Sequence, residues 1–200
     1  MKSSGIFFYR YAVQIGLAVT LMGLIPARYL FGQAVENAKK INKMLVQLQE
    51  PKKGKSKEQF IISERELNDF ITAAIEINKP KGLRKIVMNL QDNNNFYARA
   101  FIKADEIKLE GIAGKMLATL FQGDQLVEAE GHVTVKDKKV NYDLDKTRIN
   151  GMTIPAAMAS ELASYVIQEK HPQMDLNKPC DLPYGILDVR IKRNSLIIER

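Results

Sequence analysis

The feature of this sequence that most constrains its fold is an uncharged stretch near the start of the chain. Residues 11–27 read YAVQIGLAVTLMGLIPA, with Lys2 and Arg10 before them and Arg28 after them. A transmembrane helix needs roughly 20 largely apolar residues, with a range of about 17–25, so this stretch reaches the minimum length for one span. Basic residues before the stretch favour a cytoplasmic N-terminus, which places the rest of the chain outside the cytoplasm.

Other interpretations of the same stretch stay open. A secretory signal has a basic start, a shorter apolar core and small residues at its cleavage site, for which residues 32–34 (GQA) are suitable. A peripheral amphipathic helix is a third interpretation. We expect residues 1–34 to be a retained transmembrane anchor or a signal segment. The protein is then a single-pass cell-membrane protein whose C-terminal domain lies on the extracytoplasmic, periplasmic side.

The basic excess of the chain is confined to its first part. The 200 residues carry a formal net charge of +7, and residues 1–56 hold nine of the 30 basic and two of the 23 acidic side chains. The remaining 144 residues therefore have 21 of each sign. A neutral domain without Trp does not favour binding to nucleic acid. The lone Cys180 cannot form a disulfide within the chain.

Residues 35–57 read as a juxtamembrane helix followed by a basic linker. Val35, Ala38, Ile41, Leu45 and Leu48 recur at helical spacing and form one apolar stripe. The other side of this helix carries three lysines. They are Lys39, Lys40 and Lys43. Either these lysines and Arg28 lie against anionic lipid headgroups, or the stripe packs on the following domain and the lysines are solvated.

Residues 58–200 predict an α+β domain. Ser63 and Glu66 match a capping box at the start of a helix, in which Leu67, Phe70 and Ile71 share one face. Strands are expected at 58–62, 83–91, 96–103, 107–109, 126–136, 139–149, 187–192 and 196–198. A second amphipathic helix is expected from about residue 154 to 169. We expect most of these strands to form a curved antiparallel sheet of about six to seven strands, with two helices on one face.

An apolar segment interrupts the strands at residues 111–125. Met116, Leu120 and Phe121 group as on one helical face. This segment is a flap over an apolar cavity, a segment that dips into the membrane, or a short core helix.

The sequence lacks motifs for catalysis. It contains no H-E-x-x-H, G-x-S-x-G or P-loop pattern. His132 alternates with apolar neighbours on a strand, so solvent exposure explains it, and Asp143 and Asp145 are expected on a solvated strand face. We therefore expect a protein that is not an enzyme, with no catalytic residue, metal site or cofactor.

Two segments resemble a known group of proteins. They are ISERELNDF at 62–70 and RINGMTIP at 148–155. The first is similar to the strand-to-helix opening of the membrane-anchored YpmS-like and LmeA-like bacterial lipid-binding proteins, which are related to the tubular lipid-binding superfamily. The second is similar to their strand, G-x-x-x-P and helix join. This resemblance implies binding of an acyl chain or phospholipid in an apolar groove, without catalytic residues.

The function expected from these observations is a membrane-tethered envelope protein that binds or moves lipid. Apolar residues left over on the strand faces, beside an anchor, favour membrane lipids as partners. The residues expected to line the groove are Leu67, Phe70, Ile71, Phe101, Met116, Leu120, Phe121, Met158, Leu162 and Tyr165. The alternative is a non-enzymatic structural or accessory subunit of a larger membrane protein complex, in which the same apolar faces contact other proteins.

Overall fold

The computed structural model describes residues 33–50, 57–107, 122–159 and 178–200. The expected anchor and most of the second helix fall outside these residues. So do six residues of the expected sites, namely Arg28, Met116, Leu120, Phe121, Leu162 and Tyr165. Within the described ranges, no helix is both long and apolar enough to span a membrane.

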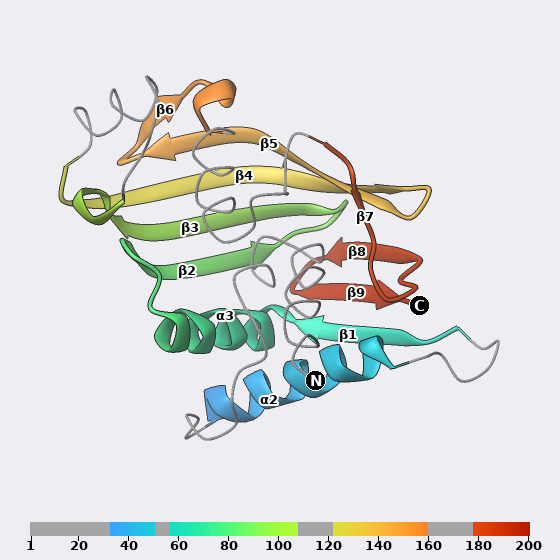
Figure 1. The fold of residues 1–200 in the computed structure, drawn as a ribbon. Helices are drawn as coiled ribbons and strands as arrows, with labels where there is room; N and C mark the ends of the chain where they lie inside the picture. The colour runs from blue at the N-terminus through green and yellow to red at the C-terminus, as the bar shows by residue number, and fades with distance from the viewer. Residues whose placement is uncertain (1–32, 51–56, 108–121, 160–177) are drawn as a thin grey trace, which may run out of the picture.

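The described strands form two antiparallel sheets (Figure 1). The small sheet has the order β1-β9-β8, with bounds Gln59–Ser63, Ser195–Glu199 and Asp188–Lys192. The large sheet has the order β2-β3-β4-β5-β6, and β7 also pairs with β5. Its strands are β2 (Leu83–Leu90), β3 (Asn95–Lys103), β4 (Asp124–Lys136), β5 (Lys139–Ile149), β6 (Met152–Ile154) and β7 (Cys180–Asp181).

The α+β class is confirmed, whereas the prediction of a single sheet is wrong. A helix separates β1 from β2 in the chain, and the edge of β1 pairs instead with β9 at the far end of the sequence. Of the strand expected at 107–109, only Ile107 is described, and it is not part of a strand. A 3-10 turn, η3 (Ala104–Glu106), follows β3 because the Glu106 carboxylate accepts hydrogen bonds from the Gly82 N–H and the Arg84 guanidinium.

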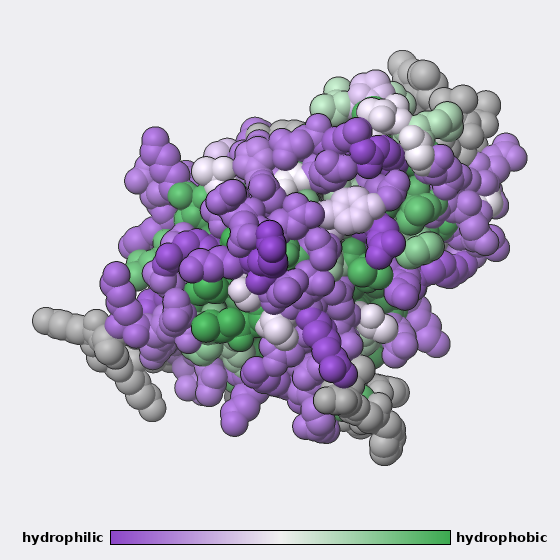
Figure 2. Space-filling model, turned by 180° about the vertical axis from the view of Figure 1, so that it is seen from behind, coloured by the Kyte–Doolittle hydropathy of each residue, from purple (hydrophilic) through white to green (hydrophobic). Residues whose placement is uncertain are grey.

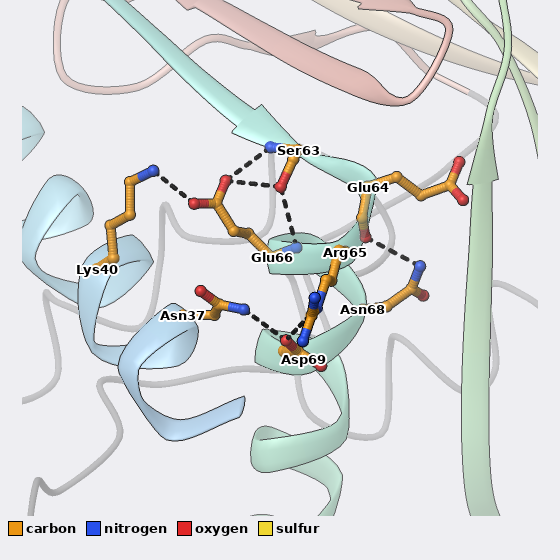
Figure 3. Close-up of polar contacts among 8 residues, drawn as sticks. All are labelled: Asn37, Lys40, Ser63, Glu64, Arg65, Glu66, Asn68 and Asp69. Atoms are coloured by element: carbon orange, nitrogen blue, oxygen red, sulfur yellow. Dashed lines mark hydrogen bonds and ion pairs between the residues drawn. The ribbon is translucent and has the colours of Figure 1, made fainter. Parts of the chain in front are cut away.

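Helix α3 (Glu64–Asn78) begins as the capping box predicts. Ser63 Oγ accepts a hydrogen bond from the Glu66 N–H at 3.3 Å, and Glu66 Oε2 accepts one from the Ser63 N–H at 2.8 Å (Figure 3). Two N–H groups that a helix start leaves free are satisfied in this way. The helix ends at Lys79, whose left-handed φ of 43° turns the chain towards β2.

Helix α3 also closes the outer edge of the large sheet. The Asn68 side chain accepts a hydrogen bond from the Met88 N–H at 2.7 Å and donates one to the Met88 carbonyl at 2.8 Å. Glu64 accepts a third bond from the Leu90 N–H at 2.6 Å. An unpaired strand edge is a template for association with other chains, and two side chains of α3 occupy this one.

Helix α2 (Gln33–Gln49) lies beside α3 and below β1 (Figure 1). The apolar stripe predicted for it is buried, with Ala38, Ile41 and Leu48 each 1% exposed. These residues share one hydrophobic cluster with α3 and both sheets. The interpretation in which the stripe packs on the domain therefore agrees with the structure.

Sharp turns connect most neighbouring strands. Asp137 and Lys138, between β4 and β5, both have positive φ, at 52° and 59°, as the predicted hairpin requires. Asn150 and Gly151, with φ of 48° and 82°, join β5 to β6 in the same manner. This last hairpin was not among the predicted elements, although an Asn-Gly pair after a strand is a strong signal for one.

Candidate functional site

The inner face of the large sheet is mainly apolar along its long strands, although the buried polar residues Gln125 and Thr147 also lie on it. The pairing register places the following side chains on this face: Ile86, Met88, Leu90, Phe96, Ala98, Ala100, Ile102, Val127, Ala129, Val133, Val135, Val140, Tyr142, Leu144 and Ile149. The part of the face on β2 and the start of β3 is buried in the main cluster with α3. Towards β4 and β5, Val127, Ala129 and Leu144 are only half-buried.

A second, smaller hydrophobic cluster lies at the far end of this face. Ile149, Ile154 and Ala159 are buried in it, and Val127, Leu144 and Met158 pack against it. Met152 is the cross-strand partner of Ile149 and is 57% exposed. Beyond the part that α3 covers, the inner face thus continues with apolar side chains that are buried or half-buried, and Met152 at its end is exposed.

The second predicted helix begins beside this cluster. Residues 156–159 are helical, and the Pro155 carbonyl accepts the first bond, from the Ala159 N–H at 3.0 Å. The helix therefore starts two residues later than predicted, because Ile154 still pairs with Thr147 as part of β6. A Pro at this position is compatible with a helix start, where a backbone N–H is not needed.

The described groove residues lie in three different places. Leu67, Phe70 and Ile71 are 3%, 1% and 0% exposed in the main core, where they fill space between α3 and the sheets. Met158 belongs to the second cluster. Phe101 is 41% exposed and alternates with Ala100 and Ile102 of the inner face, so its side chain lies on the opposite face of β3. Phe101 cannot line a groove on the inner face.

The outer face of the large sheet is polar. Cross-strand neighbours pair charges and hydrogen-bonding groups, as in the ion pair between Arg148 and Glu130 at 3.0 Å and the hydrogen bond from Tyr97 to Glu128. Seen from behind, the molecule is mainly hydrophilic, with separate hydrophobic areas between the polar side chains (Figure 2). Among the described residues of the outer face, Val87, Phe101 and Leu126 are apolar.

On the outer face, His132 meets two carboxylates. Its Nδ1 lies 3.0 Å from Asp145 Oδ2 and its Nε2 lies 3.5 Å from Asp143 Oδ2. The hydrogen bond to Asp145 raises the pKa of His132. Among the described residues, no group of three or more His, Cys, Asp or Glu side chains is arranged to hold a metal ion.

A groove of about 320 Å³ separates α2 from β1. Ile41 and Met44 of α2 and Phe60, Ile61 and Ile62 of β1 form its apolar walls. Its remaining lining residues are polar: Lys40, Lys43, Gln47, Gln59 and Glu66. The volume is at the lower end of the range of about 300–1,000 Å³ for ligand pockets.

The three lysines predicted at a membrane surface lie on the exposed side of α2. Lys39 pairs with Glu36 at 3.0 Å, and Lys40 reaches across to Glu66 of α3 at 2.5 Å (Figure 3). Burial acts to raise the pKa of Glu66, but hydrogen bonds from Lys40 and Ser63 outweigh it and lower this pKa. Lys43 is exposed at the groove.

The groove could not be predicted from the sequence because its two sides come from separate elements. Ile61 is 56% exposed, whereas its neighbour Ile62 is 2% exposed. Phe60, Ile61 and Ile62 are all apolar, so the sequence does not show which of them faces outward. Nor does the sequence show how close the strand lies to α2.

No protein-family model matches this chain, and neither a curated protein nor a solved structure similar to it was found. The similarity to YpmS-like and LmeA-like proteins stays a prediction.

Proposed function

We propose that this protein is a membrane-tethered envelope protein that binds the acyl chains of lipids on the inner face of its large sheet. The observation that carries the proposal is the apolar surface that extends past the main core to Val127, Leu144 and Met158. Soluble proteins seldom leave a continuous apolar surface without a partner. An acyl chain is an apolar partner of the kind that such a surface binds.

The energetics of this proposal require no catalytic group. Each methylene removed from water contributes about 0.8 kcal/mol, so about ten methylenes supply several kcal/mol after the cost of ordering the chain. The polar outer face favours contact with water on the other side of the sheet.

The N-terminal part of the chain supports a position next to a bilayer. The uncharged stretch at 11–27 is expected to reach the membrane, and the +7 charge lies in residues 1–56. Lys39 and Lys43 of α2 are exposed, and each basic side chain near an anionic surface is worth about 1 kcal/mol. A tether would hold the apolar face within reach of its ligand.

The test uses the full chain purified in mild detergent. Native mass spectrometry measures co-purified lipid, and displacement of a fluorescent fatty acid measures affinity. We expect Met152→Glu to weaken binding of the fatty acid about three- to tenfold, because it places a carboxylate at the exposed end of the inner face. Leu187→Glu is the matched control, since Leu187 is also an exposed apolar residue, at 40%, and precedes β8 of the small sheet.

If wild type, Met152→Glu and Leu187→Glu bind the fatty acid equally, the ligand does not bind at the inner face. Absence of bound lipid together with no uptake of the fluorescent fatty acid would contradict the proposal of lipid binding.

A second candidate function is that of an accessory subunit of a membrane protein complex. The groove between α2 and the edge strand β1 favours it, because it is a surface suited to another polypeptide. In that case a pull-down in mild detergent with the N-terminal segment intact recovers a partner in fixed stoichiometry, and a chain that elutes alone counts against it.

A further inference from the structure

The edge strands of the two sheets differ in whether other parts of the chain form hydrogen bonds with their outer backbone groups. The edge of β2 is closed by Asn68 and Glu64 of α3. At the β8 edge, Ile191 donates its N–H to Asn94 Oδ1 at 2.8 Å and accepts the Asn94 N–H at 3.1 Å. The edge strand β6 has only three residues. The edge of β1 has no comparable cover among the described residues.

The backbone direction of β1 follows from its pairing with β9. Glu58 exchanges two hydrogen bonds with Arg200, at 2.8 and 2.9 Å, and Glu64 donates to Asn194 at 2.8 Å. Because the bonding direction alternates along an antiparallel strand, Phe60 and Ile62 also point their N–H and C=O groups at β9. Gln59 and Ile61 then point theirs away from the sheet. In the described part of the chain, no hydrogen bond reaches these outward groups.

The outward groups of Gln59 and Ile61 face the groove beside α2. Both residues line it, together with Ile41 and Met44 from the helix. A groove between a helix and a free strand edge offers main-chain partners on one side and apolar contacts on the other. This combination is the one used when an extended peptide adds a strand to a sheet.

We propose that the free edge of β1 binds an extended segment of a partner protein, which adds to the small sheet as a fourth strand. The partner segment carries apolar side chains at alternate positions, which enter the groove, and a carboxylate that meets Lys43. Charge supports this choice, because Lys40 is already neutralised by Glu66 while Lys43 faces the groove without an acidic partner among the described residues. A lipid chain would leave the outward N–H and C=O groups without hydrogen bonds, which is why a polypeptide fits better.

The sharpest variant is Ile61→Pro. The Ile61 N–H points away from β9, so proline removes the outward donor without removing a bond of the existing ladder, and proline is tolerated on edge strands at such positions. Ile61→Val is the matched control, since it keeps the donor and a β-branched apolar side chain. Thermal unfolding of both variants checks that the fold is retained.

The experiment selects hexapeptides from a random phage-displayed library on the full chain in lipid nanodiscs. We expect enriched peptides with alternating apolar residues and one Asp or Glu. They should bind wild type and Ile61→Val alike, bind Ile61→Pro about tenfold more weakly, and lose affinity again in Lys43→Glu. Bound peptide should also slow hydrogen exchange at the Ile61 amide.

Four outcomes would overturn the proposal. Peptides that bind Ile61→Pro as well as wild type would show that the β1 edge is not used. Self-association of the wild type that disappears in Ile61→Pro would assign the edge to a second copy of the chain. Displacement of the selected peptides by a fatty acid, with no peptide effect on Ile61 exchange, would assign the groove to lipid. If selection on the wild type enriches no peptide relative to selection on Ile61→Pro, the β1 edge binds no such segment.

Discussion

Single polar side chains complete main-chain hydrogen bonding that neither helix nor strand supplies. Asn68 does so at the β2 edge with both the nitrogen and the oxygen of its side-chain amide. Asn94 does so at β8 from a left-handed backbone position with φ of 63°. Asn suits both tasks, because its amide offers a donor and an acceptor and its backbone tolerates positive φ.

The hydrogen bond between His132 and Asp145 leads to a prediction about pH. Because the folded state raises the pKa of His132, it binds the proton more tightly than the unfolded chain. The resulting stabilisation is fully present below the unfolded pKa of about 6.5 and is lost as pH rises through the folded pKa. We expect the difference in the free energy of unfolding between wild type and His132→Gln to be larger at pH 5 than at pH 9, measured by urea denaturation.

NMR titration of the His132 ring measures the same interaction directly, through the pKa of His132. Asp145→Asn should lower the pKa of His132 towards its ordinary value. Equal effects of His132→Gln at both pH values, or an unchanged titration in Asp145→Asn, would contradict this account.

Among the elements, α2 is attached to the domain at its end as well as along its apolar stripe. Arg200 Nη1 donates to the carbonyls of Gln47, Leu48 and Glu50, at 3.1, 2.7 and 3.1 Å, and Arg200 Nε lies 3.0 Å from Glu58 Oε2. The last carbonyls of a helix have no partner within the helix, and a cation is favourable there. Arg200 is 4% exposed, so these bonds form away from water.

We expect Arg200→Met to lower the free energy of unfolding by about 1.5–3 kcal/mol, since it removes hydrogen bonds from a charged donor. Hydrogen exchange should quicken most in the last turn of α2. The control is Arg193→Met, because the side chain of Arg193 is 77% exposed and its ion pair with Asp92 lies at the surface, which predicts a change within about 0.5 kcal/mol. Equal losses in both variants would mean that Arg200 does not hold the helix.

At the scale of the whole molecule, the β2–β3 turn joins the two sheets. The Asn94 side chain and backbone bond to Ile191 of the small sheet, and the Asn94 carbonyl accepts from Val133 of the large sheet at 2.9 Å. The Asn194 N–H, from the β8–β9 turn, donates to the Leu90 carbonyl at 3.0 Å. The two sheets therefore share a core and a bonded junction, which predicts that they unfold together.

Replacing Asn94 with Ala tests this junction. Asn93 has nearly the same backbone, with φ of 61° against 63°, so Asn93→Ala carries the same strain and serves as the matched control. We expect Asn94→Ala to cost about 1–3 kcal/mol more than Asn93→Ala, because it leaves the Ile191 N–H without its acceptor. Denaturant unfolding followed by circular dichroism measures both. If the two variants lose the same stability, the side-chain bond contributes nothing to the junction.

Much of the local structure could be predicted from the sequence. The capping box at Ser63 and Glu66, the hairpin at Asp137 and Lys138, and the apolar stripe of α2 all depend on residues close together in the chain. The candidate sites could be predicted less well. Leu67, Phe70 and Ile71 were expected to line a groove and lie in a filled part of the core, because a buried helix face reads the same whether it meets side chains or a cavity.

The sequence by itself determined the periodicity of its elements, the positions of their turns and the confinement of the charge excess to residues 1–56. These properties depend on neighbours along the chain. Only the tertiary structure decided that β1 pairs with β9, that the strands divide into two sheets, and that α2 borders a groove at the β1 edge. The physical reason is that these contacts join separate elements, and β1 and β9 lie more than a hundred positions apart. Many alternative pairings satisfy the same local pattern, and only the shared burial of apolar faces selects one.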